Sequence, residues 1–486
     1  MCGIVGIVAN YQVNKLLYNC LNGVQHRGQQ AAGMATMDGN LMHLKKGIGL
    51  IKQVIRRYDL TYLNGNAGIG HVRFPTAGSA DDPEQAHPFY VNSPFGIMLA
   101  HNGNLTNTEQ LRNEVLHQNH RHVRTKSDSE VLTNAFAAEL QDLTTNSQLS
   151  NDKIFSAIKK LNQRLSGGYA VVSLIANYGL VGFRDKFGIR PLVLGKKVAD
   201  DGFITYILAS ESCTLNTNGF ELVRDVLPGE AIIINLDGEI ESKICHDNSS
   251  LNICLFEYVY LARPDSIIEK VPVQLARQTI GKYLAQTINE QYKYLDIDVV
   301  IAVPDLARTV AIATANGINK PYCEGFVKNH LMGNENYTHD SEQFQAAVLN
   351  RLSPINLEFR NKNVLLVDTS IVRGNTSREI VKMAKSAGAH KVYLASAAPK
   401  IEYSSVYGVD MPAATKLIAH KKSNVEIAQQ VGADEVIYLS LADLKKAITE
   451  INPQLTNFEA SCFDGNYITH DITEEYLASL SHGVSH

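Results

Sequence analysis

The second residue of the chain is a cysteine, and this position lets it serve as a nucleophile at the N-terminus. Methionine is readily removed when the next side chain is small, so removal of Met1 would leave Cys2 with a thiol and a free α-amine. The reference pKa of an α-amine is about 8, so near neutral pH a useful fraction is unprotonated and can relay the thiol proton. The alternative is a buried cysteine that opens an apolar strand.

Four motifs follow Cys2, and each combines polar side chains with small residues. They lie at residues 25–33 (QHRGQQAAG), 68–78 (GIGHVRFPTAG), 100–105 (AHNGNL) and 125–130 (TKSDSE). Together with Cys2 they resemble the glutaminase domain of class II amidotransferases, a family with N-terminal-nucleophile catalysis. The resemblance covers roughly the first half of the chain and implies an αββα fold.

Release of ammonia from a glutamine side chain requires a thiolate, an oxyanion site and a grip on the amino-acid head group. The resemblance gives the oxyanion site to the Asn102 side-chain amide and the Gly103 backbone N–H. It places Arg27 near the Cys2 terminus, where its charge would favour the thiolate. A hairpin turn is the structural alternative for Asn102-Gly103, because Asn-Gly is a frequent turn sequence.

Three further residues are expected to hold glutamine. By the resemblance, Arg73 forms a forked, charge-assisted pair with the substrate α-carboxylate, Asp128 accepts from its α-ammonium, and Thr76 belongs to the same site. The structural alternatives are a surface salt bridge for Arg73 and a helix N-cap for Asp128. Two nearby positions depart from the family pattern, since Phe74 replaces a tyrosine and Gln30 replaces an acid.

The composition is that of a large enzyme with more than one domain. The chain has 486 residues, a formal net charge of -4 and a pI near 6.5, which give no electrostatic reason to expect nucleic-acid or membrane binding. No run of about 18 apolar residues is present, so we expect no membrane span, and no signal peptide is expected. Dispersed cysteines without a CxxC spacing predict a reducing, cytoplasmic environment and no iron–sulfur cluster.

The first half of the sequence predicts many short strands and a few helices, and we assign the glutaminase domain to residues 1–244. Asp237-Gly238 and the polar stretch 245–252 break the strand pattern near that boundary. The stretches 184–192 and 209–212 extend the family resemblance and are interpreted as turns and strand ends of the scaffold. Helices are expected over residues 13–21, 106–118, 129–142 and 153–164, and strands over 170–176, 205–210 and 230–235.

From residue 245 to residue 475, strand and helix patterns alternate, which predicts a domain with a mostly parallel sheet. Residues 298–303 form an apolar run typical of a strand buried on both faces. Residues 364–377 (VLLVDTSIVRGNTS) predict a buried strand, a polar loop and a helix that starts at Thr376 or Ser377. This arrangement directs backbone N–H groups at a phosphate. It resembles the phosphoribosyl diphosphate (PRPP) loop of type I phosphoribosyltransferases.

From residue 1 to about residue 475 the chain resembles the amidophosphoribosyltransferases of purine biosynthesis, and residues 476–486 are expected to form a C-terminal tail. The resemblance implies that ammonia released at Cys2 passes through an internal channel to C1 of PRPP and displaces pyrophosphate. It also implies magnesium and a homo-oligomer, either a dimer or a tetramer. The phosphoribosyl site would comprise Asp368, Thr369, Arg373, Gly374, Asn375, Thr376 and Ser377, with Asp368 as the metal ligand.

Departures from this family cluster at the diphosphate and metal site. Thr369 stands where a second acid usually follows Asp368, and Leu306 stands where a hydroxyl residue is usual. The segment after Asn329 contains no Arg or Lys until Arg351. Magnesium requires hard oxygen ligands, and each charge-assisted hydrogen bond to a phosphate contributes roughly 1.5–3 kcal/mol. These changes would therefore weaken PRPP binding.

Two alternatives to the transferase follow from these departures. The glutaminase would send ammonia to another phosphorylated acceptor, or the second domain would bind a sugar phosphate or nucleotide without transfer. Arg308 would supply positive charge in place of the missing basic residues. PRPP-dependent glutamine turnover distinguishes the transferase from both alternatives.

Overall fold

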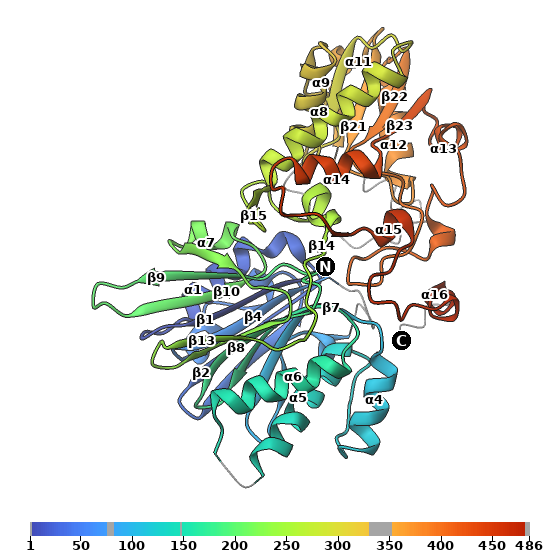
Figure 1. Ribbon diagram of the computed structural model, residues 1–486. Helices are drawn as coiled ribbons and strands as arrows, with labels where there is room; N and C mark the ends of the chain where they lie inside the picture. Colours follow the sequence, from blue (N-terminus) through green and yellow to red (C-terminus); the bar gives the residue numbers. More distant parts are fainter. Residues whose placement is uncertain (1, 75–81, 146–147, 330–351, 482–486) are drawn as a thin grey trace.

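The chain folds into two stacked domains (Figure 1). The computed structural model describes residues 2–74, 82–145, 148–329 and 352–481. The N-terminal end lies at the junction of the two domains (Figure 1). β13 (Ile240–Ile244) is the last strand of the N-terminal domain and ends at the boundary proposed from the sequence.

An antiparallel sheet with β1 near its middle forms one inner layer of the N-terminal domain. Its strands are β1 (Gly3–Val8), β2 (Ala31–Asp38), β3 (Leu41–Ile48), β4 (Ala67–Arg73), β9 (Val193–Val198), β10 (Ile204–Ala209) and β11 (Glu221–Asp225), in the order β11-β9-β10-β1-β4-β2-β3. β1 is buried along its whole length. Ile4 and Val8 face the second sheet, whereas Val5 and Ile7 face the outer helices, as the two-residue period of a strand requires.

The second inner layer is another antiparallel sheet, in the order β13-β12-β8-β7-β6-β5. Its other strands are β5 (Phe89–Val91), β6 (Ile97–Leu105), β7 (Gly167–Ile175), β8 (Gly179–Arg184) and β12 (Glu230–Asn235). The first sheet is covered by α1 (Asn14–Gly23), α2 (Ile51–Val54), α3 (Asp59–Tyr62) and α7 (Cys213–Thr217). The second is covered by α4 (Thr108–His117), α5 (Asp128–Thr144) and α6 (Asn151–Arg164). The predicted αββα layering is confirmed.

The C-terminal domain is built on a parallel sheet, as predicted. Its strands are β17 (Val299–Ala302), β18 (Tyr322–Cys323), β21 (Asn363–Asp368), β22 (Lys391–Ser396) and β23 (Glu435–Tyr438), in the order β18-β17-β21-β22-β23. Leu365 and Val367 of β21 face α8 (Val273–Gln291), α9 (Arg308–Gly317) and α14 (Leu441–Thr449). Val364 and Leu366 face α12 (Asn375–Ser386) and α13 (Asn424–Val431). Burial on both faces explains the uninterrupted apolar run of this strand.

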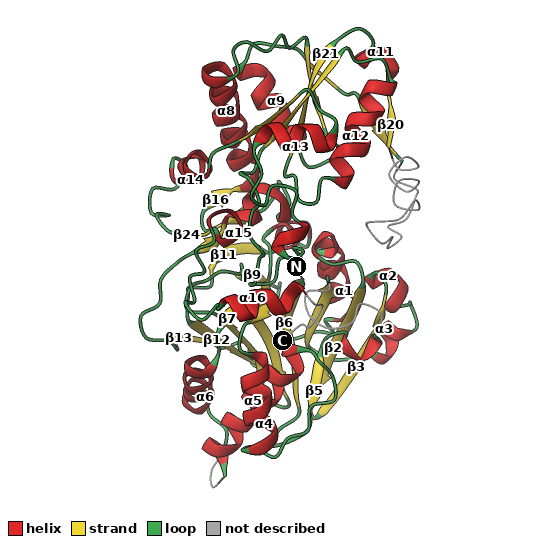
Figure 2. Cartoon of the chain, turned by 90° about the vertical axis from the view of Figure 1, so that its right-hand side faces the viewer, coloured by secondary structure: helices red, strands yellow, loops and turns green. Residues whose placement is uncertain are grey.

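Short elements connect the two domains and complete the second one. The π-helix η3 (Glu257–Leu261) follows β14 (Ile253–Cys254), which pairs in parallel with β24 (Phe458–Glu459). α16 (Glu474–Ser481) shows that part of the segment assigned to a C-terminal tail is helical, and Figure 2 shows it in front of the N-terminal domain. The remaining elements are η1 (Gln25–Arg27), η2 (Pro83–Gln85), β15 (Ile267–Ile268), β16 (Val271–Pro272), β19 (Phe326–Lys328), β20 (Leu352–Pro354), α11 (Asn356–Phe359), η4 (Ala414–Lys416) and α15 (Ser461–Asp464).

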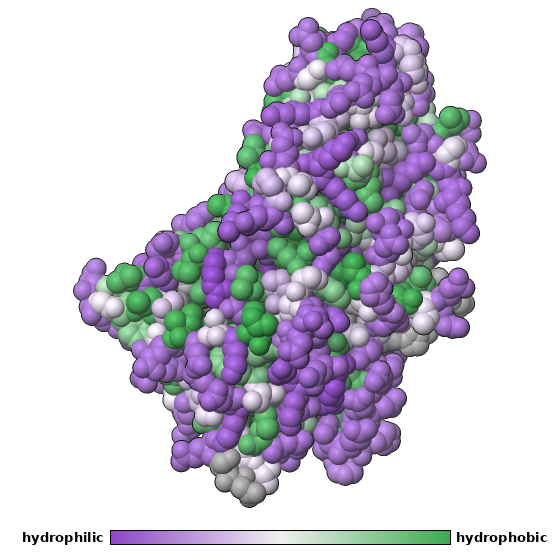
Figure 3. All heavy atoms as spheres, viewed as in Figure 1, coloured by the Kyte–Doolittle hydropathy of each residue, from purple (hydrophilic) through white to green (hydrophobic). Residues whose placement is uncertain are grey.

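The surface is mostly hydrophilic on the face shown in Figure 3, with hydrophobic residues gathered over the N-terminal domain. Exposed apolar side chains of the N-terminal domain include Val198 of β9 and Val223 of β11 in the first sheet and Ile240 of β13 in the second. Within the described part of the chain, no helix is both long enough and apolar enough to cross a bilayer.

Candidate active sites

Cys2 lies directly before β1, and only 6% of its surface is exposed. Its thiol lies 3.4 Å from the Phe74 carbonyl oxygen, to which it can donate. Its backbone nitrogen donates to the Asn102 side-chain oxygen at 3.1 Å. Removal of Met1 would turn that nitrogen into the α-amine, next to the thiol of the same residue.

Asn102 and Gly103 lie inside β6, opposite Ala170 and Tyr169 of β7, so they do not form the hairpin turn considered as the alternative. The Asn102 side-chain oxygen is occupied by the Cys2 nitrogen. Its amide nitrogen, Nδ2, is buried and has no hydrogen-bond partner among the described residues. A buried donor without an acceptor costs free energy. This donor is therefore suited to bind a substrate oxygen next to Cys2.

Three buried histidines support the strand that carries Asn102. His71 Nε2 lies 3.1 Å from the His101 carbonyl oxygen, and the His101 N–H donates to His87 Nδ1 at 3.4 Å. The His71 and His87 rings stack with their centroids 4.0 Å apart. Burial lowers the pKa of all three imidazoles. They are therefore neutral at pH 7, and His71 and His87 contact the backbone carbonyl and N–H of His101, the residue before Asn102.

Arg73, the residue expected to bind the glutamine α-carboxylate, ends β4 and is 4% exposed. Its Nη2 donates to Gln85 Oε1 at 3.3 Å, and its burial does not fit the exposed position considered as the alternative. Burial lowers the pKa of Arg73, whereas the neighbouring Cys2 and Asp128 groups raise it. Thr76, the third expected glutamine-binding residue, lies outside the described residues.

Asp128 is the first residue of α5, and Ser127 is the N-cap, so the expectation that Asp128 caps this helix is off by one residue. The Asp128 carboxylate instead accepts from the Leu105 N–H at 3.1 Å and from the Ser129 hydroxyl at 3.1 Å. It also lies 3.7 Å from His101 Nδ1. These contacts tie the start of α5 to the strand that carries Asn102 and Gly103.

Arg27 is completely buried and contacts Cys2 through the backbone. Its Nε donates to the Cys2 carbonyl oxygen at 3.0 Å, so the guanidinium contacts the peptide of Cys2 rather than the thiol. Nη1 donates to Glu211 at 2.5 Å and to Glu257 at 3.1 Å, and Nη2 donates to Glu257 at 2.9 Å. Burial opposes the charge on Arg27, but both carboxylates stabilise it and raise its pKa.

The sequence interpretation missed the importance of these two carboxylates. Residues 209–212, which include Glu211, are interpreted from the sequence as scaffold, and the sequence interpretation gives Glu257 no role. Burial disfavours the charged form of Glu211, but Arg27 and His26 outweigh that effect and lower its pKa. Acidic side chains between small or apolar residues were the available signal, because a buried charge needs a partner.

At the carboxyl end of β21, Asp368 faces the loop that precedes α12. Its Oδ1 accepts from the Thr369 N–H at 2.7 Å, and the Thr369 hydroxyl lies 3.5 Å away. Burial raises the pKa of Asp368 to about 6, although the hydrogen bonds from Thr369 oppose this shift. α12 begins at Asn375, slightly before the predicted start, and Gly374 caps it with φ at +80°. The N–H groups of a first helical turn have no intrahelical partner and favour an anion.

A magnesium ion would need several hard oxygen ligands at this site. The side chains near the ends of β17 and β21 supply Asp368, the Thr369 hydroxyl and Asp305, whereas Leu306 carries no ligand atom. Asp305 accepts from Lys328 Nζ at 2.6 Å. Within the described ranges no three His, Cys, Asp or Glu side chains cluster as metal ligands. These residues do not fit a magnesium ion held by the protein alone.

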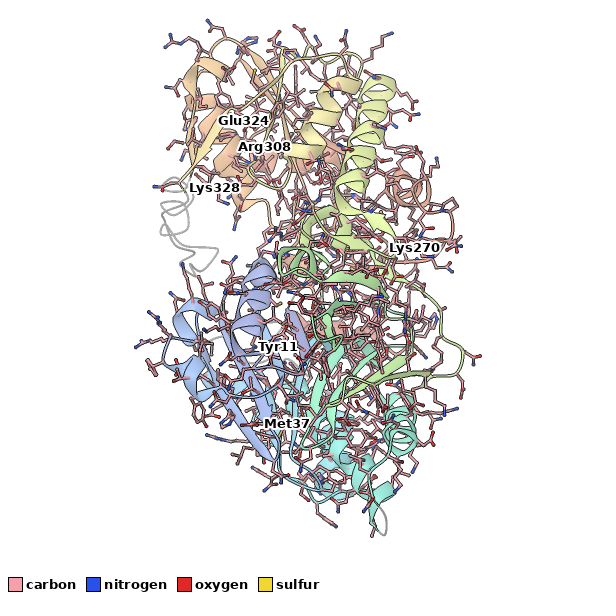
Figure 4. All side chains as sticks on the ribbon, turned by 90° about the vertical axis from the view of Figure 1, so that its left-hand side faces the viewer. Tyr11, Met37, Lys270, Arg308, Glu324 and Lys328 are labelled. Atoms are coloured by element: carbon pink, nitrogen blue, oxygen red, sulfur yellow. The ribbon has the colours of Figure 1, made fainter. Side chains whose placement is uncertain are left out.

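The positive charge expected from Arg308 is paired inside the C-terminal domain. Arg308 Nε donates to Glu324 Oε1 at 2.8 Å, and the Tyr322 hydroxyl donates to the same oxygen at 2.8 Å. Figure 4 shows Arg308 and Glu324 next to each other, with Lys328 nearby. Arg308 therefore does not supply an unbalanced positive charge, which corrects the role expected for it. The segment without basic residues, 330–350, lies outside the described residues.

The chain is similar to known proteins across both of its domains. A family model described as a glutamine amidotransferase domain matches residues 76–217. The amidophosphoribosyltransferase of Escherichia coli (strain K12) is 49% identical, over 99% of this chain and 95% of that protein. The amidophosphoribosyltransferase of Saccharomyces cerevisiae is 45% identical, over 99% of this chain and 94% of that protein. The solved structure of glutamine PRPP amidotransferase from B. subtilis, complexed with ADP and GMP, has a TM-score of 0.84 and 33% identity, covering 99% of this chain and 100% of that chain.

Proposed function

The chain belongs to the amidophosphoribosyltransferase family, and from this membership we propose how its residues divide the reaction between two sites. It is a glutamine PRPP amidotransferase of purine biosynthesis, with glutamine and PRPP as substrates. The N-terminal domain releases ammonia from glutamine, and the C-terminal domain joins that ammonia to the phosphoribosyl group.

In the N-terminal domain, the Cys2 thiol attacks the side-chain carbonyl carbon of glutamine and passes its proton to the α-amine. The carbonyl oxygen becomes an oxyanion, which Asn102 Nδ2 and the Gly103 N–H stabilise. The α-ammonium returns this proton to the leaving nitrogen, so collapse of the tetrahedral intermediate expels ammonia and leaves a glutamyl thioester. Water then hydrolyses the thioester to glutamate and releases the Cys2 thiol. The buried Nδ2 beside the Cys2 nitrogen, which has no partner among the residues that the structure describes, is the observation that carries this proposal.

Glutamine is held by its head group, because amide hydrolysis needs the side chain fixed relative to the thiol. Arg73 binds the α-carboxylate, and Asp128 accepts from the α-ammonium. Both residues are buried. Thr76 is assigned to the same task from the family resemblance.

In the C-terminal domain, ammonia attacks C1 of PRPP and pyrophosphate leaves. Asp368 and Thr369 face the ribose hydroxyls, and the loop with the start of α12 holds the 5′-phosphate through Arg373, Gly374, Asn375, Thr376 and Ser377. Because the protein offers few hard ligands, magnesium would enter as part of the PRPP substrate. Ammonia would travel from Cys2 to this pocket inside the protein.

We also propose a cytoplasmic location and a homo-oligomer. All seven cysteines are free thiols in the structure, which suits a reducing compartment. Exposed apolar side chains of the N-terminal sheets, such as Val198 and Val223, offer a surface for a second copy. Cell fractionation and sedimentation of the purified protein test these two points.

The test of function measures ammonia and pyrophosphate from purified, Met1-trimmed protein with glutamine and magnesium, with and without PRPP. We expect PRPP to stimulate glutamine hydrolysis and pyrophosphate to appear in step with it. If the rate of glutamine hydrolysis does not depend on PRPP and no pyrophosphate is released, the result would favour another ammonia acceptor or a second domain that binds a nucleotide without transfer. The relatives named above do not favour that outcome.

A further inference from the structure

Arg27 is held by one carboxylate from each domain. Glu211 follows β10 of the N-terminal domain, whereas Glu257 opens η3 of the C-terminal domain. All three side chains have no exposed surface. The remaining donor of Arg27, Nε, binds the Cys2 carbonyl oxygen at 3.0 Å. A buried chain of contacts therefore links the second domain to the nucleophile.

Glu257 contributes more to the orientation of Arg27 than Glu211 does. Glu211 contacts Nη1 alone, whereas Glu257 contacts Nη1 at 3.1 Å and Nη2 at 2.9 Å. Two parallel hydrogen bonds between a guanidinium and a carboxylate fix the plane of the guanidinium, but one bond permits rotation. The direction of the Nε–H bond toward Cys2 therefore depends chiefly on Glu257.

The π-helix η3 is itself anchored at both ends. Arg277 of α8 is fully buried and donates through Nε to the Tyr258 carbonyl oxygen at 3.0 Å and through Nη2 to the Ala262 carbonyl oxygen at 2.7 Å. Arg190 Nη1 also donates to Glu257, at 3.5 Å. π-Helical turns are rare in proteins, and those that occur are often found at functional sites. Here it places Glu257 as a fixed part of the C-terminal domain.

We propose that Glu257 is a positioning residue that makes the geometry of Cys2 depend on the docking of the C-terminal domain. It touches neither glutamine nor PRPP and acts through Arg27. This inference rests on the proposed function. It adds a physical link through which the C-terminal domain sets the rate of glutamine hydrolysis at Cys2.

The test compares Glu257→Gln with Glu257→Asp and with the control Glu269→Gln in the full-length, Met1-trimmed enzyme. Glu269 also crosses the domain boundary, where it accepts from Arg184 Nη1 at 2.7 Å, but Arg184 has no recorded contact with Cys2. Each variant is assayed for glutamine hydrolysis with and without PRPP, and for pyrophosphate release with added ammonium chloride in place of glutamine.

We expect Glu257→Gln to reduce PRPP-stimulated glutamine hydrolysis by about tenfold or more, mainly in kcat. Ammonium-dependent pyrophosphate release should stay within about twofold of wild type, because the acceptor site keeps its own residues. Glu257→Asp keeps the charge and should recover part of the loss, and Glu269→Gln should leave the PRPP stimulation unchanged.

Three results overturn the proposal: Glu257→Gln with wild-type PRPP stimulation, an equal loss in Glu269→Gln, or a parallel loss of ammonium-dependent release. If Glu257→Gln does not fold, as judged by circular dichroism, Glu257→Asp takes its place. That variant must then show reduced glutamine hydrolysis while ammonium-dependent pyrophosphate release is kept. Failure of the proposed function is distinct, since wild-type protein would then release no pyrophosphate even with ammonium chloride.

Discussion

Gly103 and Gly408 bring the two domains into backbone contact, because a Cβ atom on Gly408 would lie 2.7 Å from the Gly103 carbonyl carbon. Gly408 has φ at +94°, a conformation that other residues rarely adopt. Beside it, the Asn104 side chain donates to the Val406 carbonyl oxygen at 2.9 Å. The residue assigned to the oxyanion site is therefore supported directly by the second domain.

Replacement of Gly408 by alanine should displace Gly103 and lower glutamine hydrolysis. We expect a fall of about tenfold or more in kcat, because a shift of a fraction of an ångström weakens an oxyanion contact. Gly432→Ala is the matched control, since Gly432 also has a positive φ, +77°, but a Cβ there would meet no atom within 4 Å. Equal activity losses in the two variants would show that backbone strain alone is responsible.

Asn102→Asp separates the two tasks assigned to this side chain. An aspartate keeps an oxygen that can accept from the Cys2 nitrogen, but it replaces the Nδ2 donor with a second acceptor. We expect glutamine hydrolysis to fall by about 10²–10³ in kcat. Pyrophosphate release with ammonium chloride should persist, and retention of glutamine hydrolysis near the wild-type rate would exclude the oxyanion role.

The three buried histidines make stability fall at mildly acidic pH. Burial lowers their pKa in the folded protein, so below about pH 6.5 the unfolded chain binds protons that the folded chain does not. Each histidine then costs up to about 1.4 kcal/mol per pH unit. Denaturant unfolding measured between pH 7 and pH 5.5 should show that the free energy of unfolding decreases less for His87→Gln than for wild type. A control at the exposed His117 should keep the wild-type slope, and a wild-type slope in His87→Gln would contradict the prediction.

The charged Asp368 carboxylate should lower the free energy of unfolding of the substrate-free protein. Its folded pKa is raised from 3.8 to about 6, so the protein loses stability as pH rises through that interval. Asp368→Asn keeps an oxygen for the Thr369 N–H and removes the charge, and we expect it to gain about 1–3 kcal/mol at pH 7.5. The gain should shrink near pH 4, and PRPP-dependent pyrophosphate release should be lost. A less stable variant at pH 7.5 would contradict the burial argument.

The glutaminase elements were predictable because their signals are local. Cys2 precedes β1, Arg73 ends β4, and Asn102 lies in β6. Their proximity then follows from the resemblance to a known layered fold. The helices expected near residues 13–21, 106–118, 129–142 and 153–164 occur as α1, α4, α5 and α6 within a few residues. Periodic burial determines each of these elements within one stretch of sequence.

The ion pairs could not be predicted in the same way. Arg27 and Glu257 are 230 residues apart, and whether a charged side chain is buried depends on how the two domains pack. The pairing of Arg308 with Glu324 joins the start of α9 to the segment after β18, so the sequence could not show that this arginine was already balanced. The role of Gly408 could not be predicted from the sequence either, because its contact with Gly103 depends on how the two domains dock.

The pairing of β14 with β24 determines when the second domain can be completed during synthesis. Ile253 lies opposite Phe458. A core segment at the start of this domain therefore cannot pair until residues near the end of the chain have been synthesised. The N-terminal sheets need only residues up to Ile244, and domains generally fold as they emerge from the ribosome. Arg27 would then be buried against Glu211 long before Glu257 is docked. A nascent chain would thus carry its nucleophile without the contact that Glu257 makes with Arg27.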